Sequence, residues 1–357
     1  MKILVIQQKM IGDVLFSSVM FEALRTKYPD AQMHFAIYSN TIPVIQNNPY
    51  IDRIIDITPE IQNSKLKLFQ FLKIIKKEKY DIVIDVHGKL RSNLMTLFSK
   101  AKIRISYHKN YTSFLYSNTI VRLKEPENNA SLAIENRMKL LEPIGVSFQM
   151  ISPKIYLEEK EIKDAKTYLE KSGVDLEKPL YLISVLGSKA YKSYPEKYMA
   201  TLINFVVATK SSVQILFNYS PNQEEDAKRI FDYCSPETQK HIFFNVYGKS
   251  LREFLAIVYH CDALIGNEGG ANNMVKALNK PTFSIFIPYL HKHNWFGKNE
   301  SNKHVAIHLA DYVEFNKKDY AEAKKNPRDF YLKLKPELMI PELESFLNQL
   351  ESGAINL

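Results

Sequence analysis

Apolar residues in the first half of the chain gather into short runs, separated by stretches in which apolar and polar positions alternate at helical spacing. The runs are too continuous for half-exposed strands and are typical of strands buried on both faces of a parallel sheet. They cover residues 3–6, 32–37, 54–57 and 82–86, with helices expected up to residue 28, over 41–47 and over 64–78. This alternation predicts an α/β fold with a helix-wound parallel sheet.

A second alternation of the same kind begins near residue 180. Strands are expected over 180–185, 213–217, 242–245, 263–265 and 282–286, and helices after residue 195 and over 223–233, 251–259 and 272–278. With 357 residues the chain can form two separate cores. The two halves therefore predict two Rossmann-like domains facing a cleft that holds the active site.

A charged helix and two prolines, Pro153 and Pro179, interrupt the pattern between the halves. We accordingly expect an N-terminal domain over residues 1–170 and a second domain over 171–325. Residues 326–357 follow as a charged helical segment with an apolar stripe near its end.

Asp13 follows the first apolar run through a short loop. Parallel α/β sheets place their chemistry at the carboxyl ends of the strands, where this carboxylate is expected. Apolar residues on one face, including Val14, Phe21 and Leu24, predict that Asp13 stands at the start of a helix. Because Asp is also a preferred N-cap residue, the residues alone leave two interpretations, a helix cap or a catalytic carboxylate.

Composition narrows the class of partner. The net charge of +9 favours acidic partners such as nucleic acids, nucleoside diphosphates or an anionic lipid surface. No basic stripe with interleaved aromatic residues is present, so we do not expect a nucleic-acid partner. The two cysteines lack disulfide or metal spacing, and no run reaches the roughly 18 apolar residues of a membrane span. These features predict a protein of the reducing cytoplasm.

A pair of glycines, Gly269 and Gly270, separates the expected strand 263–265 from the following helix. Glycines bare the backbone at a helix N-terminus, whose free amides and positive dipole end suit a phosphate. A tight turn without a ligand is the alternative interpretation.

Two further strand ends carry polar and basic residues. Gly187 and Ser188 offer hydrogen-bond donors after the strand 180–185, with Lys189 and Lys192 as rival cations nearby. Lys89 and Arg91 follow the strand 82–86 and can clamp an anionic group, whereas the neighbouring His87 is expected to be a structural hydrogen-bonding residue.

Motifs of other chemistries are absent from the sequence, which has no P-loop, no G-x-G-x-x-G, no H-E-x-x-H and no zinc-type cysteine spacing. His291 and His293 can bind a metal or stack on a base, but the preferred interpretation is a polar loop that is disordered or covers the substrate. No Asp-x-Asp pair follows a strand, which favours a metal-independent reaction.

Taken together, residues 3–14, 85–92, 184–195 and 264–282 resemble the signatures of glycosyltransferase family 9, the heptosyltransferase-like family. The resemblance implies the two-lobed GT-B fold, with a C-terminal helix that crosses back and packs on the N-terminal domain. It also implies that Asp13 is the catalytic base.

The resemblance also assigns residues to the two substrates. Lys192, three residues before Pro195, matches the phosphate-binding lysine and is preferred to Lys189. The implied donor site comprises Gly187, Ser188, Lys192, Glu268, Gly269, Gly270, Ala271, Asn272 and Asn273. The implied acceptor site comprises Gly12, Lys89, Arg91 and Arg137, the last from a weaker match.

The chain departs from the family pattern at three positions. Gln7 replaces a basic residue whose charge Lys9 can supply only if the loop folds back. Glu268 replaces an Asp, and Asn273 replaces a His, so this position can form hydrogen bonds but cannot titrate.

The resemblance implies an inverting glycosyltransferase without a cofactor or metal. It moves a heptose-like sugar from a nucleoside diphosphate to a lipopolysaccharide core or another anionic surface glycan, with peripheral contact at the cytoplasmic face of the inner membrane. A catalytically degenerate nucleotide-sugar-binding protein and another GT-B enzyme, such as a nucleotide-sugar epimerase, are the alternatives.

Overall fold

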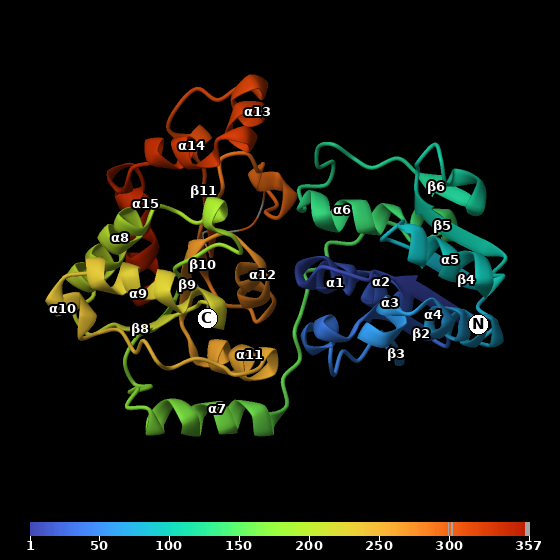
Figure 1. Ribbon diagram of the computed structural model, residues 1–357, viewed down its shortest axis with the longest axis horizontal. Helices are drawn as coiled ribbons and strands as arrows, with labels where there is room; N and C mark the ends of the chain where they lie inside the picture. The colour runs from blue at the N-terminus through green and yellow to red at the C-terminus, as the bar shows by residue number, and fades with distance from the viewer. Residues whose placement is uncertain (299, 301–302, 354–357) are drawn as a thin grey trace. The chain divides into compact units, whose positions relative to one another are not determined.

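The computed structural model describes residues 1–298, 300 and 303–353. The chain divides into two compact units, Met1–Tyr156 and Leu157–Leu357, each built around its own parallel sheet (Figure 1). Both halves therefore form α/β units of the predicted class.

The first unit contains a six-stranded sheet in the order β3-β2-β1-β4-β5-β6 with every pairing parallel. Its strands are β1 (Lys2–Ile6), β2 (Gln32–Tyr38), β3 (Arg53–Ile57), β4 (Ile82–Asp85), β5 (Ile103–Tyr107) and β6 (Asn118–Ile120). Its α-helices are α1 (Ile11–Ser17), α2 (Val19–Lys27), α3 (Pro59–Asn63), α4 (Lys65–Lys77), α5 (Leu90–Ser99) and α6 (Leu132–Lys139). The strand order reverses between β1 and β4, so the loops after these two strands flank the switch point where α/β sheets bind ligands.

Alternate residues of β1 face opposite helical layers. Leu4 and Ile6 pack in one cluster with Phe71 and Ile75 of α4 and with Met95 of α5. Helix α2 covers the other face, where the rings of Phe21 and Phe35 have centroids 4.9 Å apart. Both faces of the sheet are buried, as continuous apolar strands require.

Three elements of the first unit differ from the predictions. The helix after Asp13 is divided into α1 and α2 at Ser18, whose hydroxyl donates to the Leu15 carbonyl at 2.7 Å. The expected helix over 41–47 is a 3₁₀ helix, Ser39–Val44. Strands β5 and β6 extend the sheet beyond the strands that the sequence pattern predicted.

The second unit contains a five-stranded parallel sheet in the order β11-β10-β9-β7-β8. Its strands are β7 (Leu180–Ser184), β8 (Gln214–Phe217), β9 (Ala263–Asn267), β10 (Thr282–Ile285) and β11 (His304–Ile307). Its α-helices are α7 (Glu159–Lys171), α8 (Glu196–Thr209), α9 (Glu224–Tyr233), α10 (Pro236–Gln239), α11 (Leu251–His260), α12 (Gly270–Ala277), α13 (Lys317–Lys325), α14 (Pro327–Lys333) and α15 (Pro336–Glu351). Here the order reverses between β7 and β9, which places a second switch point at the loops that carry Lys192 and Glu268.

The predicted strand over 242–245 and the predicted domain limits differ from the structure. Ile242 makes only an isolated parallel bridge to Ile215. The unit boundary falls after Tyr156 rather than after residue 170, because α7 contributes Ala165 and Leu169 to a core of the second unit.

The apolar stripe of the C-terminal helix α15 is buried within the second unit. Leu343, Phe346 and Leu347 of α15 are buried in a cluster of the second unit, and α15 packs against α8. The ring of Phe346 lies 5.8 Å from that of Phe283 in β10. Burial within the second unit accounts for the apolar stripe that the sequence displays.

Candidate functional site

Asp13 occupies the third position of α1, directly beyond the carboxyl end of β1. Its Oδ2 accepts a hydrogen bond from the Met10 backbone N–H at 3.3 Å, and Oδ1 lies 2.9 Å from Nη2 of Arg137. The side chain remains 39% exposed, while that of Arg137 is 8% exposed. The N-cap residue of α1 is therefore Met10 and not Asp13, which instead accepts the Met10 N–H from the first turn and presents an oriented carboxylate at the sheet edge.

Arg137 holds this carboxylate through several donors. From α6 its guanidinium donates to the Ser17 hydroxyl at 2.9 Å, to the Ala133 carbonyl at 2.8 Å and to the backbone carbonyl of Asp13 at 3.0 Å. A buried guanidinium with this many partners has little freedom to rotate. The structure thus brings together two predicted site residues that are far apart in the sequence, and Gly12 lies beside them in the first turn of α1.

The loop after β1 brings a positive charge toward the same edge. Gln7 is buried and donates its side-chain amide to the Lys9 carbonyl, so it adds no charge. Lys9 is exposed, and burial together with the charge of Lys9 lowers the pKa of His87 to about 4. His87 is therefore neutral near pH 7 and does not supply a titrating acid there.

Lys109, which the sequence analysis missed, has two cationic neighbours, Lys89 and Arg122. Lys109 donates to the Gly88 carbonyl at 2.5 Å, and burial together with the charges of Lys89 and Arg122 lowers the pKa of Lys109. The guanidinium carbon of Arg122 lies 3.8 Å from the centroid of the Tyr107 ring. Lys109 lies just beyond β5 at the same sheet edge, so recognition of that strand would have revealed it.

Arg91 has different partners. Its guanidinium donates to the Tyr38 hydroxyl at 3.3 Å and to the Gln62 carbonyl, which joins the start of α5 to the end of α3. Lys89 lies near Lys109, whose pKa its charge lowers, so Lys109 adds a cation to the sheet edge where the clamp of Lys89 with Arg91 is predicted.

In the second unit, the loop between β7 and α8 carries Lys192. Gly187 donates its backbone N–H to the Ser193 hydroxyl at 3.0 Å, and a Cβ at Gly187 would lie only 2.4 Å from the Lys192 carbonyl oxygen. This close approach explains the glycine. Ser188 and Lys189 are exposed at the outer part of the loop, and Lys192 is half-buried.

Asn267, which the sequence analysis did not single out, connects the two loops of this switch point. Its side chain accepts a hydrogen bond from the Tyr194 N–H at 2.7 Å and donates to the Ser184 carbonyl at 2.8 Å. The preceding Gly266 has φ +127°, and a Cβ there would lie 2.5 Å from the Ser184 carbonyl oxygen. In the sequence, the position of a polar residue at the end of an apolar strand was the signal that could have revealed Asn267.

Glu268 is half-buried beside Lys192. Burial raises the pKa of the Glu268 carboxyl to about 7, against the opposing influence of the Lys192 charge. A carboxyl group of this kind exchanges a proton near neutral pH and donates a hydrogen bond in its neutral form.

Helix α12 begins at the glycine pair, as predicted. Among the described residues no side chain caps its N-terminus, and a Cβ at Gly269 or Gly270 would meet no atom within 4 Å. The space beside the Cα atoms of Gly269 and Gly270 is therefore open, at the helix end where the first backbone amides have no intrahelical partner. Asn272 donates to the Ser284 hydroxyl, and the following Asn273 is also buried.

The histidines of the loop after β10 pack on one another. The rings of His291 and His293 are stacked with centroids 5.1 Å apart, and the ring of His291 lies 4.0 Å from that of Tyr320. In the described part of the chain no group of three or more His, Cys, Asp or Glu side chains is arranged to hold a metal. Within the same residues, no helix has the length and apolar character needed to cross a bilayer.

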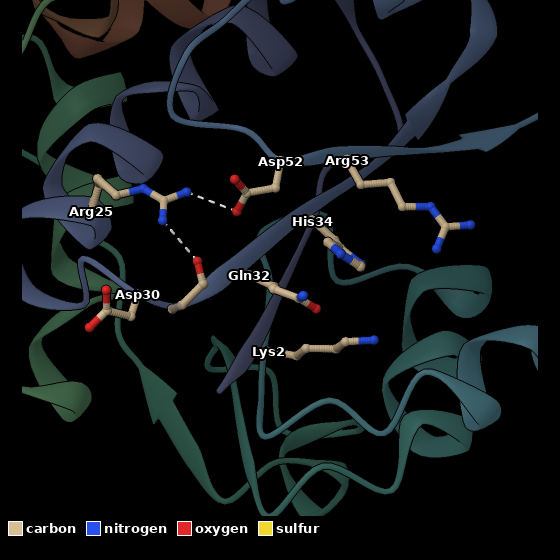
Figure 2. Close-up of a pocket in the computed structure, with 8 residues that line it drawn as sticks. Lys2, Arg25, Asp30, Gln32, His34, Asp52 and Arg53 are labelled. Carbon is tan, nitrogen blue, oxygen red and sulfur yellow. Dashed lines mark hydrogen bonds and ion pairs between the residues drawn. The ribbon is translucent and has the colours of Figure 1, made fainter.

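A pocket of about 460 Å³ lies at the amino ends of strands in the first sheet, away from the carboxyl ends that carry Asp13 (Figure 2). It is lined by Lys2, Arg25, Asp30, Ala31, Gln32, His34, Asp52 and Arg53, several of them at the amino ends of β1, β2 and β3. Figure 2 shows Arg25 bonded to Asp52, at 2.8 Å. Ion pairs use four of its charged residues, Lys2, Arg25, Asp52 and Arg53. The pocket is separate from the residues around Asp13.

The model of the family described as glycosyltransferase family 9 (heptosyltransferase) matches residues 68–325. Lipopolysaccharide heptosyltransferase 3 of Escherichia coli is 20% identical over 332 residues, covering 91% of this chain and 93% of the relative. Lipopolysaccharide heptosyltransferase 1 of Campylobacter coli is 24% identical over 303 residues, covering 80% and 84%.

Solved structures show the same fold. The family 9 glycosyl transferase of Veillonella parvula superposes with a TM-score of 0.81 at 18% identity, over 98% of this chain and 97% of that one. Escherichia coli ADP-heptose lps heptosyltransferase II gives 0.73 at 18% identity, over 98% and 100%. The fold is that of GT-B enzymes, and with most of its length matched by the family model, the chain belongs to glycosyltransferase family 9 and is a glycosyltransferase.

Proposed function

We propose that this protein transfers a heptose-like sugar, with inversion and without a metal ion, from a nucleoside diphosphate to the core of a lipopolysaccharide. In this proposal Asp13 is the catalytic base. The first unit holds the acceptor, and the second unit holds the donor.

The observation that carries the proposal is the oriented, partly exposed carboxylate of Asp13. A general base needs a fixed acceptor atom within hydrogen-bonding reach of the hydroxyl that it deprotonates. Arg137 and the Met10 N–H fix the carboxylate, while 39% exposure of the side chain leaves room for a substrate. Acceptance of the Met10 N–H alone would not require the buried guanidinium.

The donor assignment is supported by the positive end of α12 and by Lys192. When the glycosidic bond of the donor breaks, the leaving diphosphate gains negative charge, which amides and a lysine stabilise more in the transition state than in the ground state. The uncapped N-terminus of α12, with open space beside Gly269 and Gly270, matches that need. These groups supply the positive charge that a metal ion gives in other glycosyltransferases, which supports a metal-independent reaction.

Glu268 can coexist with a diphosphate because it need not be charged. With a pKa near 7, the carboxyl group gains a proton readily when a phosphate approaches. We therefore assign it to hydrogen bonds with sugar or ribose hydroxyls, together with Asn273.

The acceptor is expected to be anionic. Lys89, Lys109 and Arg122 gather at the sheet edge that carries Asp13, and cations at this density favour phosphate or carboxylate groups. The names of the relatives point the same way, because they act on lipopolysaccharide, and one solved relative is named for ADP-heptose.

The reaction then follows from one displacement. The acceptor hydroxyl oxygen bonds to the anomeric carbon as the bond from that carbon to the diphosphate oxygen breaks. Asp13 accepts the hydroxyl proton, and the diphosphate leaves with the bonding electron pair. A single displacement inverts the anomeric centre.

Replacement of Asp13 by Asn tests the proposal. Asn keeps the size of the side chain and can still accept the Met10 N–H, but it cannot accept the proton, so transfer should fall by roughly a hundredfold or more. The measurement is release of ADP from ADP-heptose in the presence of a lipopolysaccharide core acceptor, with thermal unfolding as the check on folding. Asp30→Asn, an exposed change at the opposite sheet edge, is the matched control.

Unchanged transfer by Asp13→Asn would reduce Asp13 to a structural role at the start of α1. The alternative of a nucleotide-sugar-binding protein without activity, which the non-titrating Asn273 keeps open, predicts another result. In that case the wild-type protein would bind ADP-heptose but release no ADP with any acceptor tested.

A further inference from the structure

Helices α4 and α5 of the first unit expose several large apolar side chains. They pack against each other, and their exposed apolar residues define what we call the α4–α5 face. These residues are Leu66, Phe69 and Ile74 of α4 and Leu90 and Leu97 of α5, each between 47% and 75% exposed. The buried side of α4 is supplied by other residues, Phe71, Leu72 and Ile75.

The charged residues of α4 are all basic. Its 13 residues, KLKLFQFLKIIKK, include five lysines and no carboxylate. Helix α7 has the same length and balances four lysines with four acidic residues, as a solvated helix usually does. Between described residues, the ion pairs of the structure include none of the lysines of α4, and Lys73 instead lies 4.7 Å over the ring of Phe69.

Exposed apolar side chains among unpaired positive charges match an anionic bilayer surface. Leucine and phenylalanine side chains enter the boundary between headgroups and acyl chains, and lysines interact with anionic headgroups. A second copy of the chain is a poor occupant, because a twofold contact would face five lysines with five lysines. Nucleic acid would use the lysines but gain little from Leu66 and Ile74.

The position of the α4–α5 face gives this contact a purpose. Helix α5 begins after β4 and α1 begins after β1, and these neighbouring strands are parallel, with Ile6 opposite Asp85. Leu90 at the start of α5 therefore lies on the same sheet edge as Asp13. The bond from Arg91 to the Gln62 carbonyl brings the residues just before α4 to that edge as well.

We propose that the α4–α5 face binds an anionic lipid bilayer. This contact would present the carboxyl ends of β1 and β4, beside which Asp13 lies, to an acceptor anchored in the same bilayer. The presentation of an acceptor rests on the proposed function, in which the acceptor is lipid-linked. Binding to lipid does not depend on it.

The experiment is co-flotation of the full-length protein with phosphatidylcholine vesicles that contain or lack phosphatidylglycerol, without donor or acceptor. We expect binding only to the anionic vesicles, weakened by salt. The lysine variant Lys67→Gln/Lys73→Gln/Lys76→Gln should bind at least tenfold more weakly, because each lysine near an anionic surface contributes about fivefold. The apolar variant Leu66→Ser/Phe69→Ser should lose a similar factor.

The matched control is Lys160→Gln/Lys163→Gln/Lys166→Gln on α7, which removes the same charge from another exposed helix and should leave vesicle binding within about threefold of the wild type. Because all changed residues are exposed, thermal unfolding should be unaltered. Equal loss in the α7 control, unchanged binding by the α4 variants, or binding to oligonucleotides but not to vesicles would overturn the proposal.

Failure of the proposed function has a different readout. It would appear as absent sugar transfer to a lipid-free acceptor while vesicle binding persists. The α4 variants should keep their rate on a lipid-free acceptor and lose it only on vesicle-bound acceptor.

Discussion

Glu268 offers a quantitative test of the donor side, because its protonation links the stability of the second unit to pH. Burial raises the pKa of its carboxyl from 4.5 to about 7. Between these two values the unfolded chain has lost the proton while the folded chain retains it, so the free energy of unfolding falls as pH rises. At about 1.4 kcal/mol per pH unit, the loss is about 3 kcal/mol and is complete above pH 7.

Glu268→Gln preserves the shape of the side chain and removes the ionisation. The variant and the wild type should have equal free energies of unfolding at pH 4.5, and the variant should be more stable by about 3 kcal/mol at pH 8. Urea unfolding followed by tryptophan fluorescence suits the measurement, because the single tryptophan, Trp295, belongs to the second unit. Glu225→Gln on the exposed side of α9 is the control and should show no such trend.

The pH dependence of donor binding is a second test of the protonation of Glu268. Ionised Glu268 would repel a diphosphate, so ADP should bind wild type more weakly at pH 8 than at pH 6, and the Gln variant should lose most of that dependence. A stability difference that stays constant from pH 4.5 to 8 would refute the buried, proton-exchanging carboxyl and with it the role given to Glu268.

The loops of the second unit lead to two further predictions. Lys192→Ala should weaken ADP binding and slow transfer by tenfold or more, while Lys189→Ala should change both by less than about threefold; the reverse result in isothermal titration would make Lys189 the phosphate-binding lysine. Gly266→Ala should destabilise the second unit by about 2 kcal/mol or more, because its Cβ would meet the Ser184 carbonyl at φ +127°. Gly270→Ala, which meets no atom within 4 Å, should stay within about 1 kcal/mol in urea unfolding, and equal losses at the two glycines would contradict the close approach described at Gly266.

Sequence periodicity predicted the sheets well where apolar runs are continuous. The runs that became β1, β2, β7 and β9 are buried on both faces, and such strands leave a strong signal. The run at 242–245 is equally apolar, yet Ile242 makes only one bridge, since the sheet edge beside β8 is not extended further. Ser18 divides the first helix through a local side-chain bond that periodicity does not detect.

The candidate site could be predicted only in part from the sequence, because several of its contacts join residues that the fold brings together. The family resemblance predicts roles for Asp13 and Lys192, but the residue that orients Asp13 in the fold is Arg137, which lies more than a hundred residues away in the sequence. Lys109 and Arg122 follow strands that the pattern did not reveal. The raised pKa of Glu268 depends on burial, which a sequence does not record.

Every contact that orients Asp13 comes from the first unit, and the Asn267 bonds that hold the Lys192 loop come from the second. Under the proposed function, acceptor and donor preference are therefore encoded in separable stretches of the gene, divided near codon 156. A chimera that joins residues 1–156 to the matching C-terminal portion of a relative would keep both sets of orienting bonds. If such a chimera takes the nucleotide of that relative and still depends on Asp13, nucleotide preference can be exchanged without rebuilding the contacts of the proposed catalytic base.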